Sequence, residues 1–145
     1  MSACTLACNL GVEMIICHIG DSRAYRLRGG QMEQLTRDMT IAQDLVDAGT
    51  LDAAGKRVSN LRHVLTQSIG TGKAKADVQR QTLQDGDRIL LCTDGLTEMV
   101  RDTEIADVLR TFANAADACH ALVQRALGYG GRDNVTVVLA DYRVK

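Results

Sequence analysis

A short apolar run that stops at an acidic turn sets the framework of this chain. Residues 89–92 read Ile-Leu-Leu-Cys, and Asp94 and Gly95 follow directly after Thr93. A run of this length, bounded by turn residues, is typical of a buried β-strand. Asp-Gly is ordinary turn chemistry, because Gly accepts positive φ and Asp bonds to the nearby backbone. A carboxylate at the end of a buried strand also suits a metal ligand, so this motif alone leaves both interpretations open.

The pattern of strands and helices along the chain indicates an α+β fold or a layered sandwich. Helices are expected from a Thr40 cap over residues 41–48, from an Asp102 or Thr103 cap to Phe112, and from an Asn114 cap to Gly128. Residues 50–75 lack a steady period and are expected to form a mobile surface segment. Alternating apolar residues and turn pairs predict strands at 3–9, 12–19, 22–28, 31–36, 78–83, 88–93 and 135–142.

Size and charge exclude several classes of function. The chain has 145 residues, which predicts a single domain, and its 17 basic and 18 acidic residues are interspersed. We therefore expect no nucleic-acid partner and no membrane partner that depends on bulk charge. The first 20 residues do not resemble a signal peptide. Five cysteines without a CxxC pair fit a reduced, cytoplasmic chain.

Three short loops share one design, in which an Asp next to glycine follows an apolar strand or a helix. They are HIGDSR with Asp21, CTDGLTE with Asp94 and YGGRDNVTV with Asp133. Each loop taken alone is most simply a turn. Together they suit a divalent cation, which needs carboxylates from separate segments on stiff supports.

No side chain stands out as a catalytic nucleophile. Cys119 lies beside His120, but adjacent positions on a helix face about 100° apart, so the pair does not form a thiol and base dyad. His18 lies on an apolar strand and is expected to be a hydrogen-bonded core residue. The phosphate-loop, dinucleotide, zinc-protease and GxSxG motifs are absent.

The ordered motifs GDSRAY, QLTRD, LTQSIG, GDRILLCTDGLTE and GGRDNVTVVL together resemble the bacterial type of the protein phosphatase 2C (PPM) family. This resemblance implies a two-layer β-sandwich flanked by helices, with Mg²⁺ or Mn²⁺ activating a water that attacks a phosphoserine or phosphothreonine in a protein. It implies that Asp94 and Asp133 are ligands of a core metal and that Asp21 and Asp94 hold a further metal. Residues 50–75 correspond to a mobile flap beside the cleft.

The chain departs from the family pattern at its start. The family's N-terminal section, with its strands, helices and DGxGG turn, has no counterpart, so residues 1–145 are expected to be the C-terminal portion of a single phosphatase-like domain. We expect such a chain to be weak or inactive alone; the alternative is a catalytically dead binding or regulatory module. Uncovered sheet edges predict a homodimer.

Overall fold

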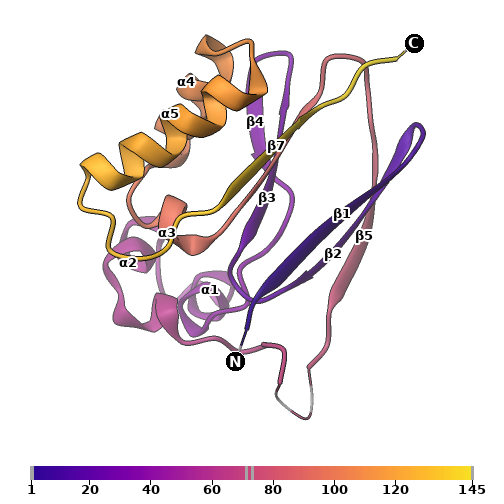
Figure 1. The fold of residues 1–145 in the computed structure, drawn as a ribbon. Helices are drawn as coiled ribbons and strands as arrows, with labels where there is room; N and C mark the ends of the chain where they lie inside the picture. Colours follow the sequence, from indigo (N-terminus) through magenta and orange to yellow (C-terminus); the bar gives the residue numbers. More distant parts are fainter. Residues whose placement is uncertain (1, 71, 73, 145) are drawn as a thin grey trace.

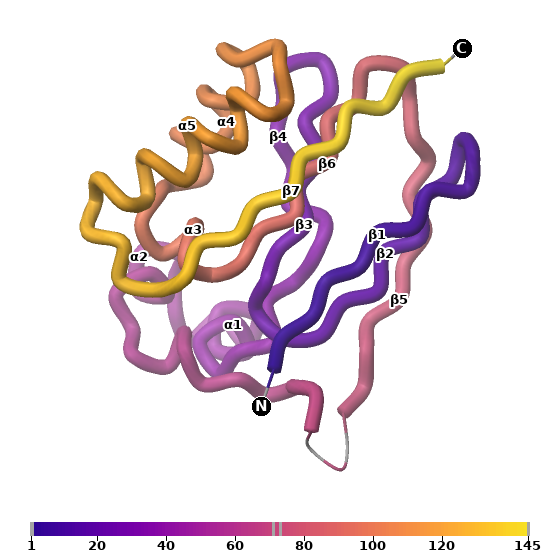
Figure 2. The backbone as a smooth tube through the Cα atoms, viewed as in Figure 1, coloured from indigo at the N-terminus to yellow at the C-terminus, as the bar shows by residue number. Residues whose placement is uncertain are grey.

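The computed structural model describes residues 2–70, 72 and 74–144, which form two antiparallel sheets packed face to face (Figures 1 and 2). This arrangement confirms the expected two-layer β-sandwich. The first sheet has the order β1-β2-β5, with β1 Cys4–Leu10, β2 Glu13–Ile19 and β5 Asp77–Thr82. The second has the order β4-β3-β6-β7, with β4 Gln31–Gln34, β3 Arg23–Arg28, β6 Arg88–Cys92 and β7 Val137–Asp141.

Strand β6 is covered on both faces, by the first sheet on one side and by a layer of helices on the other. Its apolar run is buried on both faces, because successive side chains of a strand point in opposite directions. Ile89 faces the first sheet and packs in a cluster with Met14 and Ile16 of β2. Leu90 and Cys92 face the other way, into a cluster shared with the C-terminal helices.

Helices α4 Asp102–Thr111 and α5 Ala115–Gly128 cover the outer face of the second sheet (Figure 1). Their apolar stripes meet at Ile105, Leu109 and Leu122, all of which are fully buried. Asn114 caps α5, as predicted, by accepting hydrogen bonds from the N–H groups of the first turn.

Four short helical segments lie at the end of the sandwich near the predicted site: α1 Ile41–Asp47, α2 Ala53–Val58, the 3-10 helix η1 Asn60–His63 and α3 Asp94–Thr97. Thr40 caps α1 as predicted. The expectation of an irregular segment across residues 50–75 was wrong for α2 and η1. Both are too short to show a hydrophobic period, and neither contains a buried residue.

The structure corrects two further details. Asp94 and Gly95 begin α3 and are not an open turn. Helix α4 has Arg101 as its N-cap instead of Asp102 or Thr103. The Glu104 carboxylate accepts a hydrogen bond from the Arg101 backbone N–H at 3.1 Å, and in this way satisfies a donor that a capping side chain does not reach.

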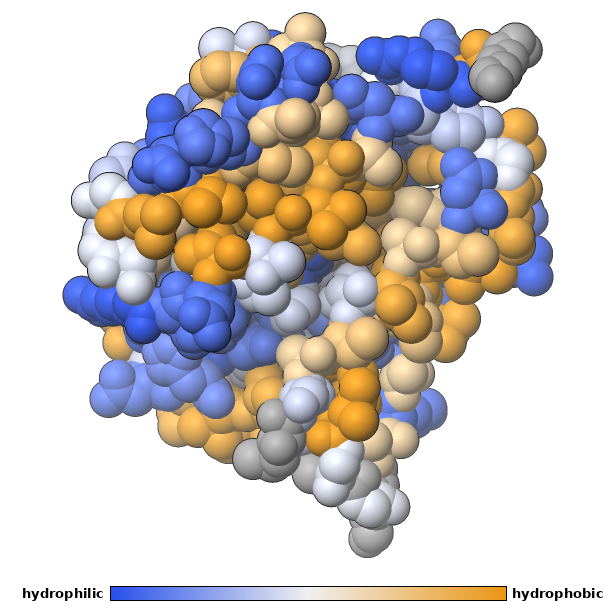
Figure 3. Space-filling model, in the orientation of Figure 1, coloured by the Kyte–Doolittle hydropathy of each residue, from blue (hydrophilic) through white to orange (hydrophobic). Residues whose placement is uncertain are grey.

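The outer face of the first sheet is not covered by any of the helices in the described part of the chain (Figure 1). Leu6 of β1 and Val78 of β5 point outward there, and each is about 60% exposed, with values of 60% and 63%. In Figure 3, apolar residues gather over β1 and beside β7. None of the helices found among the described residues is long and apolar enough to span a bilayer.

Candidate metal-binding site

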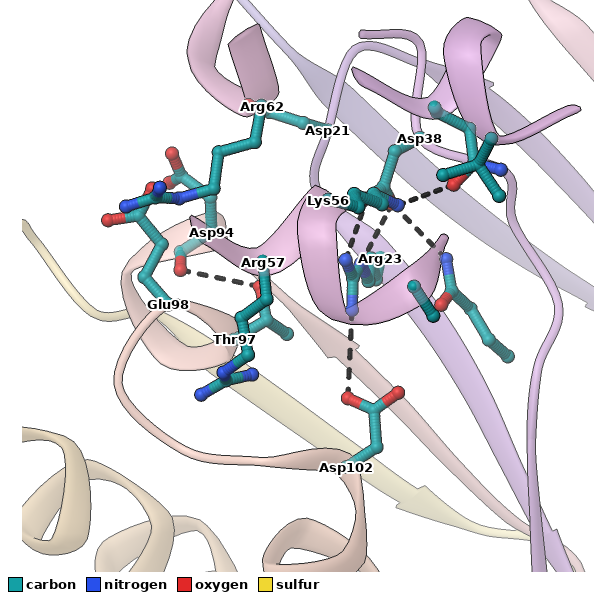
Figure 4. Close-up of a pocket in the computed structure, with 14 residues that line it drawn as sticks. Asp21, Arg23, Asp38, Lys56, Arg57, Arg62, Asp94, Thr97, Glu98 and Asp102 are labelled. Carbon is teal, nitrogen blue, oxygen red and sulfur yellow. Dashed lines mark hydrogen bonds and ion pairs between the residues drawn. The ribbon is translucent and has the colours of Figure 1, made fainter. Parts of the chain in front are cut away.

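An open cavity of about 310 Å³ lies where the loop after β2, the start of α3 and the segment carrying α2 and η1 meet. Figure 4 shows Asp94 and Glu98 on one side of it, and Asp38 with Arg23 and Lys56 on the other. It combines acidic and basic side chains: Asp21, Asp38, Asp94, Glu98 and Asp102, with Arg23, Lys56, Arg57 and Arg62. The cavity therefore brings Asp21 and Asp94 together, as the sequence predicted for two of its three candidate ligands.

Gly20 fixes the position of Asp21 at the end of β2. Its φ is +104°, and a Cβ added there would lie 2.4 Å from the Ala3 Cβ. Only glycine fits this close approach without moving Ala3, the residue before β1. The Gly20 carbonyl also accepts a hydrogen bond from Met39 N–H at 2.8 Å, which anchors the turn to the segment before α1. Asp21 is thus held on a rigid support.

Gly95 plays the same part for Asp94. A Cβ at this position would lie 2.3 Å from the Asn134 carbonyl oxygen, so the loop of residues 133–134 packs directly on the start of α3. The Thr93 hydroxyl links the same two segments, because it donates to the Asn134 carbonyl and accepts from Thr136 N–H. Asp94 therefore stands on a junction between β6, α3 and the loop before β7.

Asp133, the third predicted ligand, lies on that neighbouring loop but is not among the residues that line the cavity. Its carboxylate is exposed and accepts a hydrogen bond from Asn134 N–H at 2.6 Å. The structure brings the Asp133 backbone against Gly95, since its carbonyl carbon would be 3.5 Å from an added Cβ. Among the described residues, no hydrogen bond or ion pair joins its carboxylate to Asp94 or Asp21.

Asp38 is a buried carboxylate committed to protein partners. Its side chain is 6% exposed and receives Arg23 through two bonds, Nε to Oδ1 at 2.7 Å and Nη2 to Oδ2 at 2.6 Å. Lys56 Nζ of α2 adds a third contact at 2.8 Å. Burial by itself raises the pKa of Asp38, but the hydrogen bonds and charges of Arg23 and Lys56 outweigh it and hold the pKa below its ordinary value.

Asp21 has the opposite environment. Burial raises its pKa to about 6, and the negative charges of Asp94, Asp38 and Glu98 push in the same direction. Within the described part of the chain, no ion pair reaches the carboxylates of Asp21 or Asp94. Two carboxylates that share a cavity and make no ion pair among the described residues suit a hard divalent ion with oxygen ligands, so the donor set fits Mg²⁺ or Mn²⁺.

The other candidate groups behave as structural residues. His18 is 1% exposed, its Nδ1 lies 2.9 Å from the Thr5 hydroxyl and its Nε2 lies 3.0 Å from the Arg37 carbonyl oxygen. This confirms the predicted core histidine, and burial lowers its pKa. Burial also raises the pKa of the Cys92 thiol to about 12, so Cys92 is not an activated nucleophile.

Several residues of the cavity escaped the sequence interpretation. Glu98 follows Asp94 by four positions, and this helical spacing is the signal that could have identified it once α3 was recognised. Arg57 and Arg62 line the cavity, and His63 lies beside it in contact with Glu98. All three belong to a segment without a regular period, so only their charge marked them. Their place beside Asp94 depends on long-range packing of α2 and η1.

Sequence comparison finds phosphatases among the relatives of this chain. It is 37% identical over 131 residues to the serine/threonine protein phosphatase PstP of Mycobacterium tuberculosis, and the matched region covers 90% of this chain and 25% of PstP. It is 38% identical over 130 residues to the protein phosphatase PhpP of Streptococcus pneumoniae, and this match covers 89% of this chain and 53% of PhpP. The chain thus spans a quarter to about half of the length of these relatives.

Solved structures agree with this relationship. A crystal structure of the Mycobacterium tuberculosis phosphatase PstP/Ppp matches with a TM-score of 0.93 and 35% identity, over 98% of this chain and 60% of that one. A structure of the catalytic domain of PstP in complex with two manganese ions matches with a TM-score of 0.88 and 35% identity, over 96% of this chain and 57% of that one.

A sequence model of a protein family also matches. Residues 50–143 fit the family described as Stage II sporulation protein E (SpoIIE). This match spans more than half of the chain, and the sandwich with its acidic cavity agrees with it. The chain therefore belongs to the family of SpoIIE- and protein phosphatase 2C-type domains.

Proposed function

We propose that this chain contributes the metal-binding edge of a metal-dependent serine/threonine phosphoprotein phosphatase. The observation that carries the proposal is the pair Asp21 and Asp94, two carboxylates that share a cavity and make no ion pair with any of the described residues. Asp133, on the loop packed against Gly95, completes the proposed ligand set. Since the chain spans 57% of the PstP catalytic domain solved with two manganese ions, we propose that it is the C-terminal portion of such a domain.

A bound Mg²⁺ or Mn²⁺ would supply a water of lowered pKa and positive charge next to the phosphoryl oxygens. The protein side chains hold and orient the participants. Asp94 and Asp133 would hold a core metal, and Asp21 with Asp94 would hold a further one. The cluster of Asp38, Arg23 and Lys56 keeps α2 against the cavity. No side-chain nucleophile is required for this reaction.

Arg57 and Arg62 are the proposed contacts for the phosphate of the substrate. Both line the cavity from the α2 and η1 side, and no ion pair with a carboxylate occupies them in the part of the chain that the structure covers. Arginine binds phosphate with several donors in a plane, which suits a phosphoserine or phosphothreonine side chain entering an open cavity.

Calorimetric titration with Mn²⁺ tests the ligand set. We expect binding by the wild-type chain and weaker binding by Asp94→Asn and Asp133→Asn, while Asp117→Asn, an exposed carboxylate on α5, serves as the matched control. Absence of Mn²⁺ binding by the wild type would overturn the proposal and leave a catalytically dead binding or regulatory module.

Hydrolysis of a phosphopeptide with Mn²⁺ tests the reaction itself. We expect weak or absent turnover by the 145-residue chain. A longer protein that also contains an N-terminal segment of the phosphatase domain should show higher turnover. Strong turnover that survives Asp94→Asn in the isolated chain would contradict both the ligand assignment and the role of an additional segment.

The remaining assignments follow from the same proposal. The substrate is a phosphoprotein of a signalling pathway, and the chain acts in the cytoplasm, which its five free cysteines support. In isolation the chain is proposed to form a homodimer through its uncovered sheet edges, since unpaired strand edges accept a further strand.

A further inference from the structure

Outside the Asp21 and Asp94 pair, one other cluster has the composition of a metal site. His63 of η1, Asp94 at the start of α3 and Glu98, the C-cap of α3, each offer one ligand atom, and these atoms all lie within 4.8 Å of one another. His63 Nδ1 is 2.7 Å from Glu98 Oε1. The three side chains come from two elements that are 31 or more positions apart in the sequence, counting from His63 to Asp94.

A simple ion pair explains only part of this arrangement. Asp94 and Glu98 are four positions apart on one helical turn, where two negative charges repel each other. His63 offers at most one positive charge, and its 2.7 Å contact is with Glu98. Within the cluster, two carboxylates therefore face a single histidine, while Arg57 and Arg62 line the same cavity without an ion pair among the described residues.

We propose that His63, Asp94 and Glu98 form a transition-metal site that fastens η1 to α3. The inference deepens the proposed function and shares only Asp94 with it. Metal bonds of about 2.1 Å place ligand atoms about 3 Å or more apart, so the present spacing needs only small adjustments. The His63 side chain is 45% exposed, which leaves an entry path for the ion.

The ligand chemistry separates this site from the all-carboxylate one. Imidazole favours Zn²⁺, Cu²⁺, Fe²⁺ and Ni²⁺, whereas Mg²⁺ and Mn²⁺ suit oxygen ligands and Mg²⁺ gives up water reluctantly. A transition metal here fixes the end of the segment that carries Arg57 and Arg62, the proposed phosphate contacts. Metal supply would thereby control whether this segment keeps its place at the wall of the cavity.

Imidazole NMR with Zn²⁺ as the probe tests the site directly. The chain has three histidines: His63, the buried His18 and the exposed His120 on α5. With the imidazole nitrogens labelled with ¹⁵N, we expect Zn²⁺ to shift the nitrogen resonances of His63 at the lowest metal concentrations and to leave those of His120 unchanged. Millimolar Mg²⁺ should leave all three unchanged.

Matched variants make the outcome decisive. Calorimetry should show Zn²⁺ affinity at least about 100-fold lower for His63→Ala and Glu98→Gln, since loss of a direct ligand exceeds the 10- to 100-fold cost of losing a supporting contact. His120→Ala and Asp133→Asn should keep the His63 shift, and Asp133→Asn separates this site from the proposed core metal. If His63→Ala binds Zn²⁺ as tightly as the wild type, or if the His63 resonances do not respond to Zn²⁺, the cluster is only an ion pair and the inference fails.

Discussion

The Asp87 carboxylate anchors the turn between β5 and β6 from a fully buried position. Its side chain is 1% exposed and binds Arg28 through Nε to Oδ1 at 2.7 Å and Nη2 to Oδ2 at 2.6 Å. It also accepts a hydrogen bond from Gln84 N–H at 2.8 Å. Burial alone raises the pKa of Asp87, but Arg28 and the Gln84 N–H outweigh burial and lower it from 3.8.

Asp87→Asn should lower the free energy of unfolding by about 2 to 3 kcal/mol at neutral pH, because charged hydrogen bonds are lost in a buried site. Because the pKa of Asp87 is lowered in the folded state, its ionised carboxylate stabilises the protein at pH values above 3.8, its ordinary pKa. This stabilisation is lost as the pH falls through the folded-state pKa. The variant should therefore show a shallower loss of stability in acid. Urea unfolding at a series of pH values measures both effects.

The control for this prediction is Asp107→Asn, whose side chain on α4 is 68% exposed and pairs only with Arg110 three positions away. It should change the free energy of unfolding by less than about 0.5 kcal/mol. Equal losses in the two variants would show that charge alone, and not the buried turn, determines the result.

Gly95→Ala tests whether the contact between α3 and the loop before β7 supports the site. The added Cβ would meet the Asn134 carbonyl at 2.3 Å, so the 133–134 backbone must move. We expect a loss of about 1 to 3 kcal/mol in stability and weaker Mn²⁺ binding, because Asp133 moves away from Asp94. Gly128→Ala, which has open space around the added Cβ, should leave Mn²⁺ affinity unchanged. Wild-type Mn²⁺ affinity in Gly95→Ala would argue against Asp133 as a ligand.

Among the elements, α2 depends on polar contacts for its position, because none of its residues is buried. Lys56 connects it to Asp38 and to Gln43 of α1. Lys56→Ala should raise amide hydrogen exchange in α2 and η1 about tenfold, since roughly 1.4 kcal/mol of local stability corresponds to a factor of ten. Arg23 remains on Asp38, so exchange in the sheets should not change.

Lys75→Ala, which removes an exposed lysine from the loop before β5, is the matched control and should leave exchange in α2 unchanged. If Lys56→Ala leaves exchange in α2 and η1 at the wild-type rate, the ion pair with Asp38 does not hold this segment.

The elements that could be predicted from the sequence are those whose own residues determine them. Strand β6 has a continuous apolar run, and α5 has an Asn114 cap and a full apolar stripe, so both were predicted correctly. Helices α2 and η1 carry no such stripe and exist through contacts with distant residues such as Asp38. Arg101 as the N-cap of α4 could not be predicted from side-chain preference, because the bond comes from Glu104.

The same distinction holds for the site. Asp21 and Asp94 could be placed together from the sequence because each lies two positions after the end of a strand, and the sandwich brings the ends of β2 and β6 to one cavity. The Asp133 loop reaches Gly95, but its carboxylate direction depends on local hydrogen bonding that the sequence does not specify. The cations Lys56, Arg57 and Arg62 depend on the fold of the whole segment.

At the scale of the whole molecule, the two sheets leave a gap between their edge strands β1 and β7. An apolar groove of about 190 Å³ opens there, with Ala7 and Met14 on the side of the first sheet and Leu91, Val138 and Ala140 on the side of the second. Val138 is 55% exposed, and apolar surface continues over β1 (Figure 3). Both edge strands carry unpaired backbone groups on one side. Apolar surface next to a free strand edge favours pairing with another chain.

We therefore expect the isolated 145-residue chain to show a concentration-dependent shift from monomer to dimer in multi-angle light scattering. Val138→Lys should move the equilibrium toward the monomer, because it places a charge in the apolar groove beside the free edge of β7. Val58→Lys changes a residue that is 78% exposed on α2, away from this groove, and should dimerise like the wild type. A longer product in which an additional segment covers the same edges should remain monomeric at all concentrations, whereas a wild-type chain that is monomeric from micromolar to millimolar concentration would rule out the dimer.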